Sequence, residues 1–429
     1  MSQFKLSLDN TKRFALVVAV AVALGAAGAL VTFAFIRLLD WLTELVWTWL
    51  PKALGVSGTG AAFVIVTCTI GGVAVGCARR YLGDNPLELQ QALKIFRDTH
   101  RFDYRHLPNA IVISLASLVF GAALGPESIL VAIVGGVSTF VVDRIKHVAN
   151  YAWAISYVGI SGALGALFGS PFGSAALPIE TSDGDRLPKL WTYVPGLLSA
   201  FAGVYIFKLL ANGGYLDFDF LPYTFSASDL LIAVPVAIAC ALSGTLYLVS
   251  LFALDYVAGR IGGLVIKATL GGIVLGFMGT VSYLVLFSGR NGIQTLLTDN
   301  EQLSTAYLFG IGILKLFAAS WCLAMAWKGG RFFPLMFAGA AIGLGIAHGV
   351  SGVPDMVGIA VGMTAGLAAV IQKPIAVALL MLLIFPLDLW AIAVIAALVG
   401  SAVGVGLKSV SRHPEIFGGL EGVPESKAA

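Results

Sequence analysis

Charged residues are scarce in this sequence, and their scarcity excludes a water-soluble protein. Lysine, arginine, aspartate and glutamate make up only 11% of the 429 residues, whereas 58% are hydrophobic and the mean hydropathy is +0.92. A soluble chain of this length carries roughly a quarter charged residues. Too little polar surface is therefore available to hold the chain in water, and the composition predicts an integral membrane protein.

Cysteine is also scarce, which argues against a disulfide framework and a thiolate metal site. The cysteines lie singly in apolar segments, without a Cys-x-x-Cys pattern or a Cys/His cluster. Cysteine in such surroundings packs as a small apolar residue. No cofactor is therefore expected, and the net charge of +3 gives no sign of a nucleic-acid partner. The positions concerned are Cys68, Cys77, Cys240 and Cys322.

The sequence does contain a series of long uncharged runs. Crossing a hydrocarbon core about 30 Å thick takes roughly 20 residues of helix. Run 148–179 is longer than one span and contains Pro171 and Pro178, so we expect a helix, a break and a second, shorter helix there. The runs expected to span are 14–36, 53–78, 230–254, 268–289, 332–354 and 389–407.

Shorter apolar stretches fill most of the rest, and they predict partial or re-entrant helices. The 51 glycines favour this arrangement, because glycine lets helices approach closely and end inside the membrane. The expected fold class is all-α, a polytopic membrane protein with one transmembrane domain over 1–429. Lys12 and Arg13 lead straight into an apolar run, so no cleavable signal peptide is expected. The short tail after Lys408 predicts no soluble regulatory domain.

Three loop-then-helix patterns recur in the same order in both halves of the chain, at an offset of about 205 residues. Two such repeats are typical of secondary transporters, whose binding site lies where broken helices meet near the midplane. We expect repeats of about 58–212 and 262–412. The matching patterns are 83–86 with 289–292, 125–127 with 330–334, and 162–171 with 365–374.

The two repeats are expected to have inverted topology. The loop Lys94–Arg105 is rich in basic residues, whereas the matching region, 299–302, is acidic and lacks positive charge. By the positive-inside rule the first loop is cytoplasmic, and the second therefore lies on the other side of the membrane.

The helix breaks suggest an anion site. A helix that begins inside the membrane leaves its first N–H groups unpaired and carries about half a positive charge at that end. Helices beginning near Asn85, Pro126, Asn291 and Phe332 would direct such ends at the interface between the repeats. An anion could be held there without a full opposite charge, so that it can also leave.

Glu127 is the leading candidate for function. It lies between the uncharged runs 107–126 and 128–142, deep in the membrane, where a charge is costly unless compensated. A carboxylate at a helix start competes with an anion for the same place, and its protonation would free that place. The alternative is a glutamate that only caps its helix.

Other charges at membrane depth have less defined roles. Arg331 either draws anions toward the pathway or faces lipid headgroups. Lys315 either reaches the interface or pairs with a carboxylate. Glu180 precedes a polar run and is interpreted as a solvated helix end.

At these residues the sequence resembles the CLC family of chloride channels and proton/chloride exchangers. Gly125–Ile129 (G-P-E-S-I) is similar to the family's G-R-E-G-P motif, with Glu127 at the gating position. Gly330–Pro334 (G-R-F-F-P) satisfies G-x-F-x-P, and Gly83–Pro86 (G-D-N-P) falls where the family has G-S-G-I-P. The resemblance thus gives as anion-binding candidates Gly83, Asp84, Asn85, Gly125, Pro126, Gly330, Arg331, Phe332 and Phe333.

The resemblance implies a multi-pass protein of a bacterial inner membrane, not an enzyme, assembled as a homodimer with one pathway per subunit. Its substrate would be a small inorganic anion, chloride being expected, with or without coupled protons. Three family features differ here: Gly83 stands at the position of the anion-binding serine, no tyrosine follows Tyr307, and Thr181 aligns with the second glutamate of many exchangers. Channel and exchanger both stay open.

Two other classes of function fit parts of the sequence. A transporter of an organic or cationic solute on a similar repeat is suggested by Asp84. An intramembrane serine hydrolase is suggested by Gly159–Gly162 (G-I-S-G), with His348 as a base. A small residue at a helix contact explains Ser161 equally simply.

Overall fold

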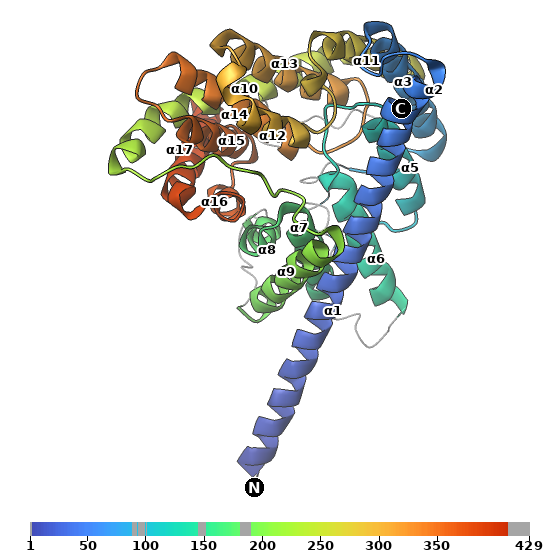
Figure 1. The fold of residues 1–429 in the computed structure, drawn as a ribbon. Coiled ribbons are helices and arrows are strands. Elements are labelled where there is room, and N and C mark those ends of the chain that lie inside the picture. Colours follow the sequence, from blue (N-terminus) through green and yellow to red (C-terminus); the bar gives the residue numbers. More distant parts are fainter. Residues whose placement is uncertain are drawn as a thin grey trace.

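The computed structural model describes residues 2–87, 92, 99, 101–144, 152–180 and 190–410. The secondary structure of these residues is helical, apart from one isolated bridge between two loops. Figure 1 shows the helices packed into one body, from which the N-terminal part of α1 extends. The first half contains α1 (Ser2–Glu44), η1 (Leu45–Trp49), α2 (Leu50–Leu54), α3 (Ala61–Leu82), α5 (Leu107–Val119), α6 (Glu127–Arg144), α7 (Ala152–Phe168), α8 (Pro171–Glu180) and α9 (Leu190–Ala211).

The second half has matching helices in the same order. It contains α10 (Ala227–Ala258), α11 (Leu264–Val281), η3 (Tyr283–Val285), α12 (Arg290–Thr298), η4 (Asn300–Gln302), α13 (Thr305–Ala324), α14 (Phe332–Gly349), α15 (Asp355–Ile371), α16 (Pro374–Leu382), η5 (Leu387–Leu389) and α17 (Trp390–Val410). Among the described residues, eight helical stretches are long and apolar enough to cross a membrane. The chain is therefore an all-helical, polytopic membrane protein.

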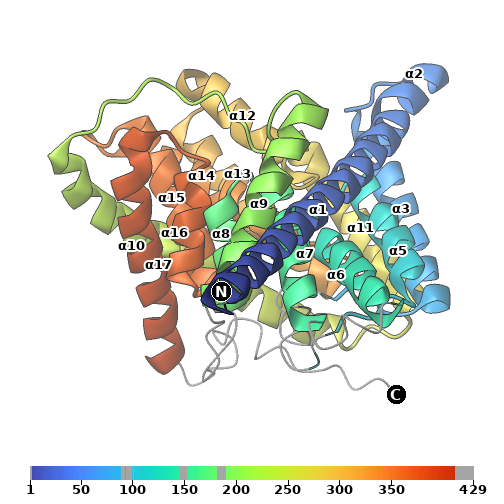
Figure 2. The same cartoon turned by 90° about the horizontal axis from the view of Figure 1, so that it is seen from below.

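The described helices from α3 to α9 correspond in order to the helices from α11 to α17, if α12 is left out. Partners such as α3 and α11, or α8 and α16, pack directly against each other. In Figures 1 and 2, α8 and α16 lie side by side, with α9 on one flank and α17 on the other. We propose that the repeats occupy about 58–212 and 262–412, as the sequence predicts.

Run 148–179 is broken as predicted: α7 ends at Phe168, Gly169 takes a positive φ of 68°, and α8 begins at Pro171. The predicted spans at 53–78 and 268–289 are wrong at their ends. α3 begins only at Ala61, and α11 ends at Val281 before a short 3-10 turn. Apolar, uncharged loops are compatible with the membrane when they are covered by protein, so the absence of charge does not mark a helix end.

Glycines bring α14 and α15 into backbone contact. A Cβ on Gly343 would lie 1.9 Å from the carbonyl oxygen of Gly358, and one on Gly339 would lie 2.1 Å from that of Gly362. Such close approach is typical of helix packing in membranes, where small residues let backbones meet. The contact fixes the axis of α14, and hence the position of its first residue, Phe332.

Candidate functional site

The two helix breaks predicted from the repeat meet in space. The segment before α6 and the segment before α14 run antiparallel and are joined by two backbone hydrogen bonds, from Gly125 N to Gly330 O (2.8 Å) and from Gly330 N to Gly125 O (2.7 Å). Such antiparallel pairing of corresponding residues is compatible with the predicted inverted repeat. Both helix starts, at Glu127 and Phe332, therefore lie at one place in the core.

Three of the predicted helix starts agree with the structure to within one residue. α14 begins at Phe332 as predicted, α6 begins at Glu127 instead of Pro126, and α12 begins at Arg290 instead of Asn291. The fourth predicted start lies near Asn85. The residues that would continue such a helix, from 88 to 91, lie outside the described part of the chain. Half of the loop 94–105, and Thr181, lie outside it as well.

The side chain of Glu127 crosses from the first repeat to the second. It is completely buried, and its Oε1 accepts a hydrogen bond of 2.7 Å from the backbone N–H of Phe332, 205 residues away. Its Oε2 is buried without a hydrogen-bond partner among the described residues. The carboxylate thus occupies the unpaired, positive start of α14, the position that suits a small anion.

The glycines on either side leave just enough space for this carboxylate. A Cβ on Gly330 would lie 2.0 Å from Glu127 Oε1, and one on Gly125 would lie 2.1 Å from Oε2. No side chain larger than hydrogen fits at either position while Glu127 stays where it is. The glycines of both motifs therefore shape the site in addition to pairing the two segments.

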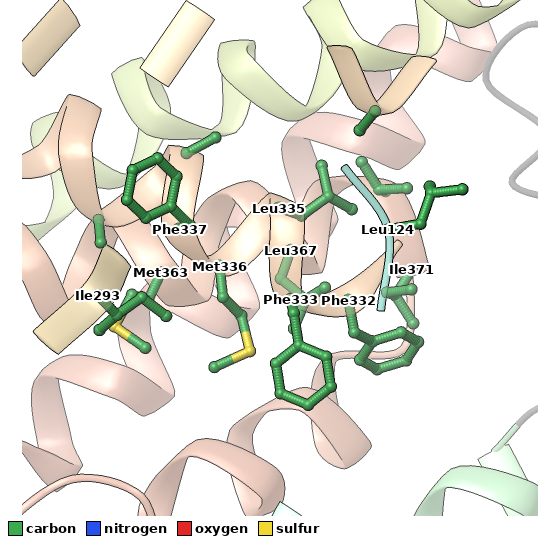
Figure 3. Packing of buried hydrophobic residues seen from close by; sticks show 14 of the residues in the cluster. Leu124, Ile293, Phe332, Phe333, Leu335, Met336, Phe337, Met363, Leu367 and Ile371 are labelled. Atoms are coloured by element: carbon green, nitrogen blue, oxygen red, sulfur yellow. The ribbon is translucent and has the colours of Figure 1, made fainter. Parts of the chain in front are cut away.

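Aromatic rings form the rest of the wall. Phe168 at the end of α7 lies 5.5 Å from the ring of Phe332 and 5.8 Å from that of Phe333, and Tyr215 meets Phe333 edge-on at 5.8 Å. Figure 3 shows Phe332 and Phe333 next to each other at the start of α14. The sequence predicted Phe332 and Phe333 here, but not Phe168 or Tyr215, which carry no motif.

A cavity of about 340 Å³ leads from the protein surface to Pro126, the residue next to Glu127. The guanidinium of Arg290 lies 4.5 Å over the ring of Tyr215 and its Nε donates to the Tyr215 carbonyl, so a fixed positive charge lines this cavity. Asp40 and Glu44 line it from α1. Glu127 itself is fully buried and does not line the cavity, which reaches its neighbour Pro126.

Among the described residues, no hydrogen bond or ion pair joins Gly83 or Asp84 to Glu127. Gly83 has a positive φ of 95°, which glycine adopts without strain, and Asn85 follows it in the same turn. Asp84 binds Arg79 and, at 2.8 Å, the ammonium of Lys328. Burial raises the pKa of the Asp84 carboxyl, but the charges of Lys328 and Arg79 outweigh this and hold the pKa below its usual value.

Arg331 does not face lipid headgroups, so that alternative is wrong. Its residue is only 5% exposed, and the guanidinium lies 5.8 Å over the buried ring of Tyr247 on α10. Glu180 is also not a freely solvated helix end, because its two oxygens accept hydrogen bonds from the backbone N–H groups of Ile375 (3.2 Å) and Ala376 (2.5 Å) at the start of α16. Helix starts thus bind carboxylates at two places in this fold.

Within the described part of the chain, Lys315 neither reaches the interface nor pairs with a carboxylate. Its Nζ is fully buried within 3.1 Å of four consecutive carbonyl oxygens, those of residues 284–287, and lies 5.3 Å from the centre of the Phe337 ring. These carbonyls follow α11 and have no helical partners of their own. Lys315 therefore fixes the loop that leads to α12. Residues of this loop line the cavity.

Ser161 and His348 have separate hydrogen-bond partners. The Ser161 hydroxyl donates to the carbonyl of Tyr157 in its own helix (2.9 Å), and His348 Nδ1 lies 3.2 Å from the carbonyl of Leu303. No contact joins the two among the described residues. Ser161 is thus a small residue in a helix contact, as the simpler interpretation has it.

Comparison with known proteins agrees with this geometry. The profile of the voltage-gated chloride channel family matches residues 70–405. The protein named "Putative ion-transport protein YfeO" from Escherichia coli O139:H28 is 28% identical over 348 residues, which cover 78% of this chain and 79% of the relative; the protein of the same name from Shigella boydii serotype 4 matches equally well.

Solved structures with the same fold include a CLC-type fluoride/proton antiporter (TM-score 0.75, 16% identity, 91% of this chain and 95% of that one). A slow cyanobacterial Cl⁻/H⁺ antiporter gives a TM-score of 0.77 at 16% identity, over 90% of this chain and 95% of that one. A eukaryotic CLC transporter gives 0.72 at 18% identity, over 91% of this chain and 71% of that one. The CLC fold therefore extends over most of the chain.

Proposed function

Because this chain belongs to the voltage-gated chloride channel family, a family of ion transporters and not of enzymes, we propose that it carries a small inorganic anion across the membrane under the control of Glu127. Chloride is the expected ion. The observation that carries the proposal is the hydrogen bond from Phe332 N–H to Glu127 Oε1, which puts a carboxylate where an anion would bind. When Glu127 is protonated and leaves, the same N–H becomes available to the transported ion.

The anion pathway runs from the cavity beside Pro126 past Glu127 and Phe332. Gly125, Gly330 and Phe333 shape the site, and Arg331 supplies a buried positive charge next to it. Membership of the family removes the serine hydrolase hypothesis. Asp84 gives little support to a cation transporter, because its charge is already bound to Lys328 and Arg79.

The proposal is tested with purified protein in liposomes that are loaded in turn with chloride, fluoride, nitrate or a large organic anion, while internal pH is recorded. We expect flux of at least one small inorganic anion and none of the large one. Proton uptake driven by the anion gradient would identify an exchanger, and its absence a channel. The assay includes both fluoride and chloride, because solved structures with the same fold include an antiporter for each of these ions. Absence of flux for every inorganic anion would refute the proposed function.

We further propose a homodimer in a bacterial inner membrane, formed through the faces of α8, α9, α16 and α17. Large apolar side chains project from these helices without an intramolecular partner to cover them, among them Tyr205, Ile375 and Leu398. In lipid, their association must come from packing, because lipid tails are as apolar as leucine.

Replacing Leu398 with tryptophan is expected to shift the protein from dimer to monomer, because the larger ring disturbs packing on the α17 part of this face. Leu231→Trp is the matched control, since Leu231 is also an exposed leucine, on α10 and outside the proposed face. The mass of each protein in detergent and its crosslinking in membranes provide the readout. A wild-type protein that is monomeric under both conditions would contradict the proposal.

A further inference from the structure

The linker between α9 and α10 passes beside the candidate site. Its residues, 212–226, form neither helix nor strand, and Figures 1 and 2 show the linker running from α9 past α12 to α10. The backbone N–H of Asp219 donates to Gln294 Oε1 on α12 (3.1 Å), and the ring of Phe220 packs against that of Phe385, with centres 5.5 Å apart. The linker is therefore held against the second half of the molecule, next to the helix whose first residues line the cavity.

Tyr215 is the residue of this linker that enters the pathway. It lines the cavity, and its ring also meets that of Phe333 edge-on at 5.8 Å. Phe333 and Glu127 are fully buried, and neither lines the cavity. Burial raises the pKa of the Tyr215 hydroxyl, and the charge of Glu127 is close enough to raise it further. Tyr215 therefore lies between the open cavity and the buried site.

Arg290 holds the ring of Tyr215 in this position. Its guanidinium lies 4.5 Å over the ring, its Nε donates to the Tyr215 carbonyl, and its Nη1 donates to Asn291 Oδ1 (3.1 Å). A cation over the face of an aromatic ring attracts that ring. Other residues at the inner end of the cavity are fixed by backbone contacts: Leu124 adjoins the paired Gly125, and Leu286 belongs to the loop bound by the Lys315 ammonium. Tyr215, on a linker without helix, is the part of this wall that can turn.

We propose that the ring of Tyr215 is a second, steric barrier in the anion pathway, which lies between the cavity and Glu127 and limits the size of the anion that passes. Arg290 holds this barrier closed. The inference rests on the proposed function and adds a specificity-determining residue to it. The two barriers differ in kind: Glu127 excludes an anion by its charge and yields to acid, whereas Tyr215 excludes it by volume.

The reactivity of a cysteine behind the ring tests the barrier without any measurement of transport. Phe333→Cys is made in a Cys77→Ser protein, because the other native cysteines are buried. Its reaction with methyl methanethiosulfonate, a small neutral reagent, is followed by mass spectrometry. Tyr215→Ala should speed this reaction at least about tenfold, because a buried thiol otherwise reacts only when the protein opens locally. Tyr215→Phe keeps the ring and should leave the rate unchanged, whereas Arg290→Gln releases the ring and should increase the rate.

Anion selectivity in liposomes tests the role of the ring in transport. The ratio of methanesulfonate flux to chloride flux should be at least about tenfold higher in Tyr215→Ala than in the wild type, because discrimination of this order is lost when a site no longer excludes one additional methyl-sized group. External acid should still increase chloride flux, since Glu127 is unchanged. Tyr215→Phe should keep the wild-type ratio.

Tyr223→Ala is the matched control, because Tyr223 lies in the same linker but donates to Asp229 at the start of α10 and does not line the cavity. It should change neither the labelling rate nor the flux ratio. Elution as a single species on size exclusion establishes that each variant is folded.

Two results would overturn the barrier: an unchanged labelling rate in folded Tyr215→Ala, or an equal increase in Tyr223→Ala. A wild-type flux ratio in a Tyr215→Ala protein that transports chloride would refute the role in selectivity. If labelling responds as expected but no variant carries an inorganic anion, the proposed function fails while the barrier stands, so the two failures are distinguishable.

Discussion

Glu127→Gln is expected to transport anions at the same rate at every external pH, whereas the wild-type protein should transport faster as the external medium becomes more acidic. The ionised carboxylate occupies the start of α14 and excludes the anion, and protonation releases it. Each unit of acidification raises the protonated fraction by up to about tenfold until most of the carboxyl is protonated. Glutamine has the shape of the protonated acid and cannot ionise. Any proton movement that accompanies wild-type transport should therefore stop in this variant.

Anion flux against external pH in liposomes measures this difference. Glu180→Gln is the matched control, because Glu180 also accepts backbone hydrogen bonds at a helix start but lies against α16, away from Glu127. It should keep the wild-type dependence on external pH. If Glu127→Gln kept it too, Glu127 would be only a helix cap, whose loss costs about 1 kcal/mol of stability, and the gating mechanism would lose its main support.

Gly330→Ala should reduce anion flux by roughly one to two orders of magnitude at every pH. The added methyl would lie 2.0 Å from Glu127 Oε1, in the volume that the carboxylate and, after its departure, the anion occupy. Overpacking a well-filled site typically costs about 1–3 kcal/mol, and each 1.4 kcal/mol corresponds to about a tenfold loss of occupancy. Acidification should not restore the flux, because protonating Glu127 does not remove the methyl.

Gly310→Ala is the control for this substitution. Gly310 lies in α13, and a Cβ there would have no atom within 4 Å, so the change adds the same methyl without a clash. Both variants are compared for elution volume and thermal unfolding in detergent before flux is measured. Wild-type flux through a folded Gly330→Ala protein would mean that the anion does not pass between Gly330 and Glu127.

The two variants test different links of the same mechanism. Glu127→Gln changes the charge and keeps the space, whereas Gly330→Ala keeps the charge and fills the space. A pathway gated by a carboxylate requires both to have an effect, with opposite consequences for flux at neutral pH. If Glu127 had only a structural role, both variants would lose stability, and neither would change the dependence of anion flux on pH.

The sequence alone determined the class of protein, the break after α7 and the helix starts that form the site. These features are local: a run without charge, a Gly-Pro-Glu or a Gly-x-Phe-x-Pro pattern acts through the backbone of its own segment. The resemblance of the motifs to the CLC family led to the same fold. The helix ends near 53 and 289 were missed, because hydropathy does not distinguish an apolar helix from an apolar loop that protein covers.

Only the tertiary structure decided which groups meet. The bond between Glu127 and Phe332 joins residues 205 positions apart, and the four carbonyls around Lys315 converge only because α13 packs against the loop after α11. Asp84 was predicted at an anion site, yet its partners are Arg79 near the end of α3 and Lys328 in the loop between α13 and α14. A charged side chain in the membrane interior has no water to solvate it. Its partners are therefore the groups that the packing of the repeats brings within hydrogen-bond distance.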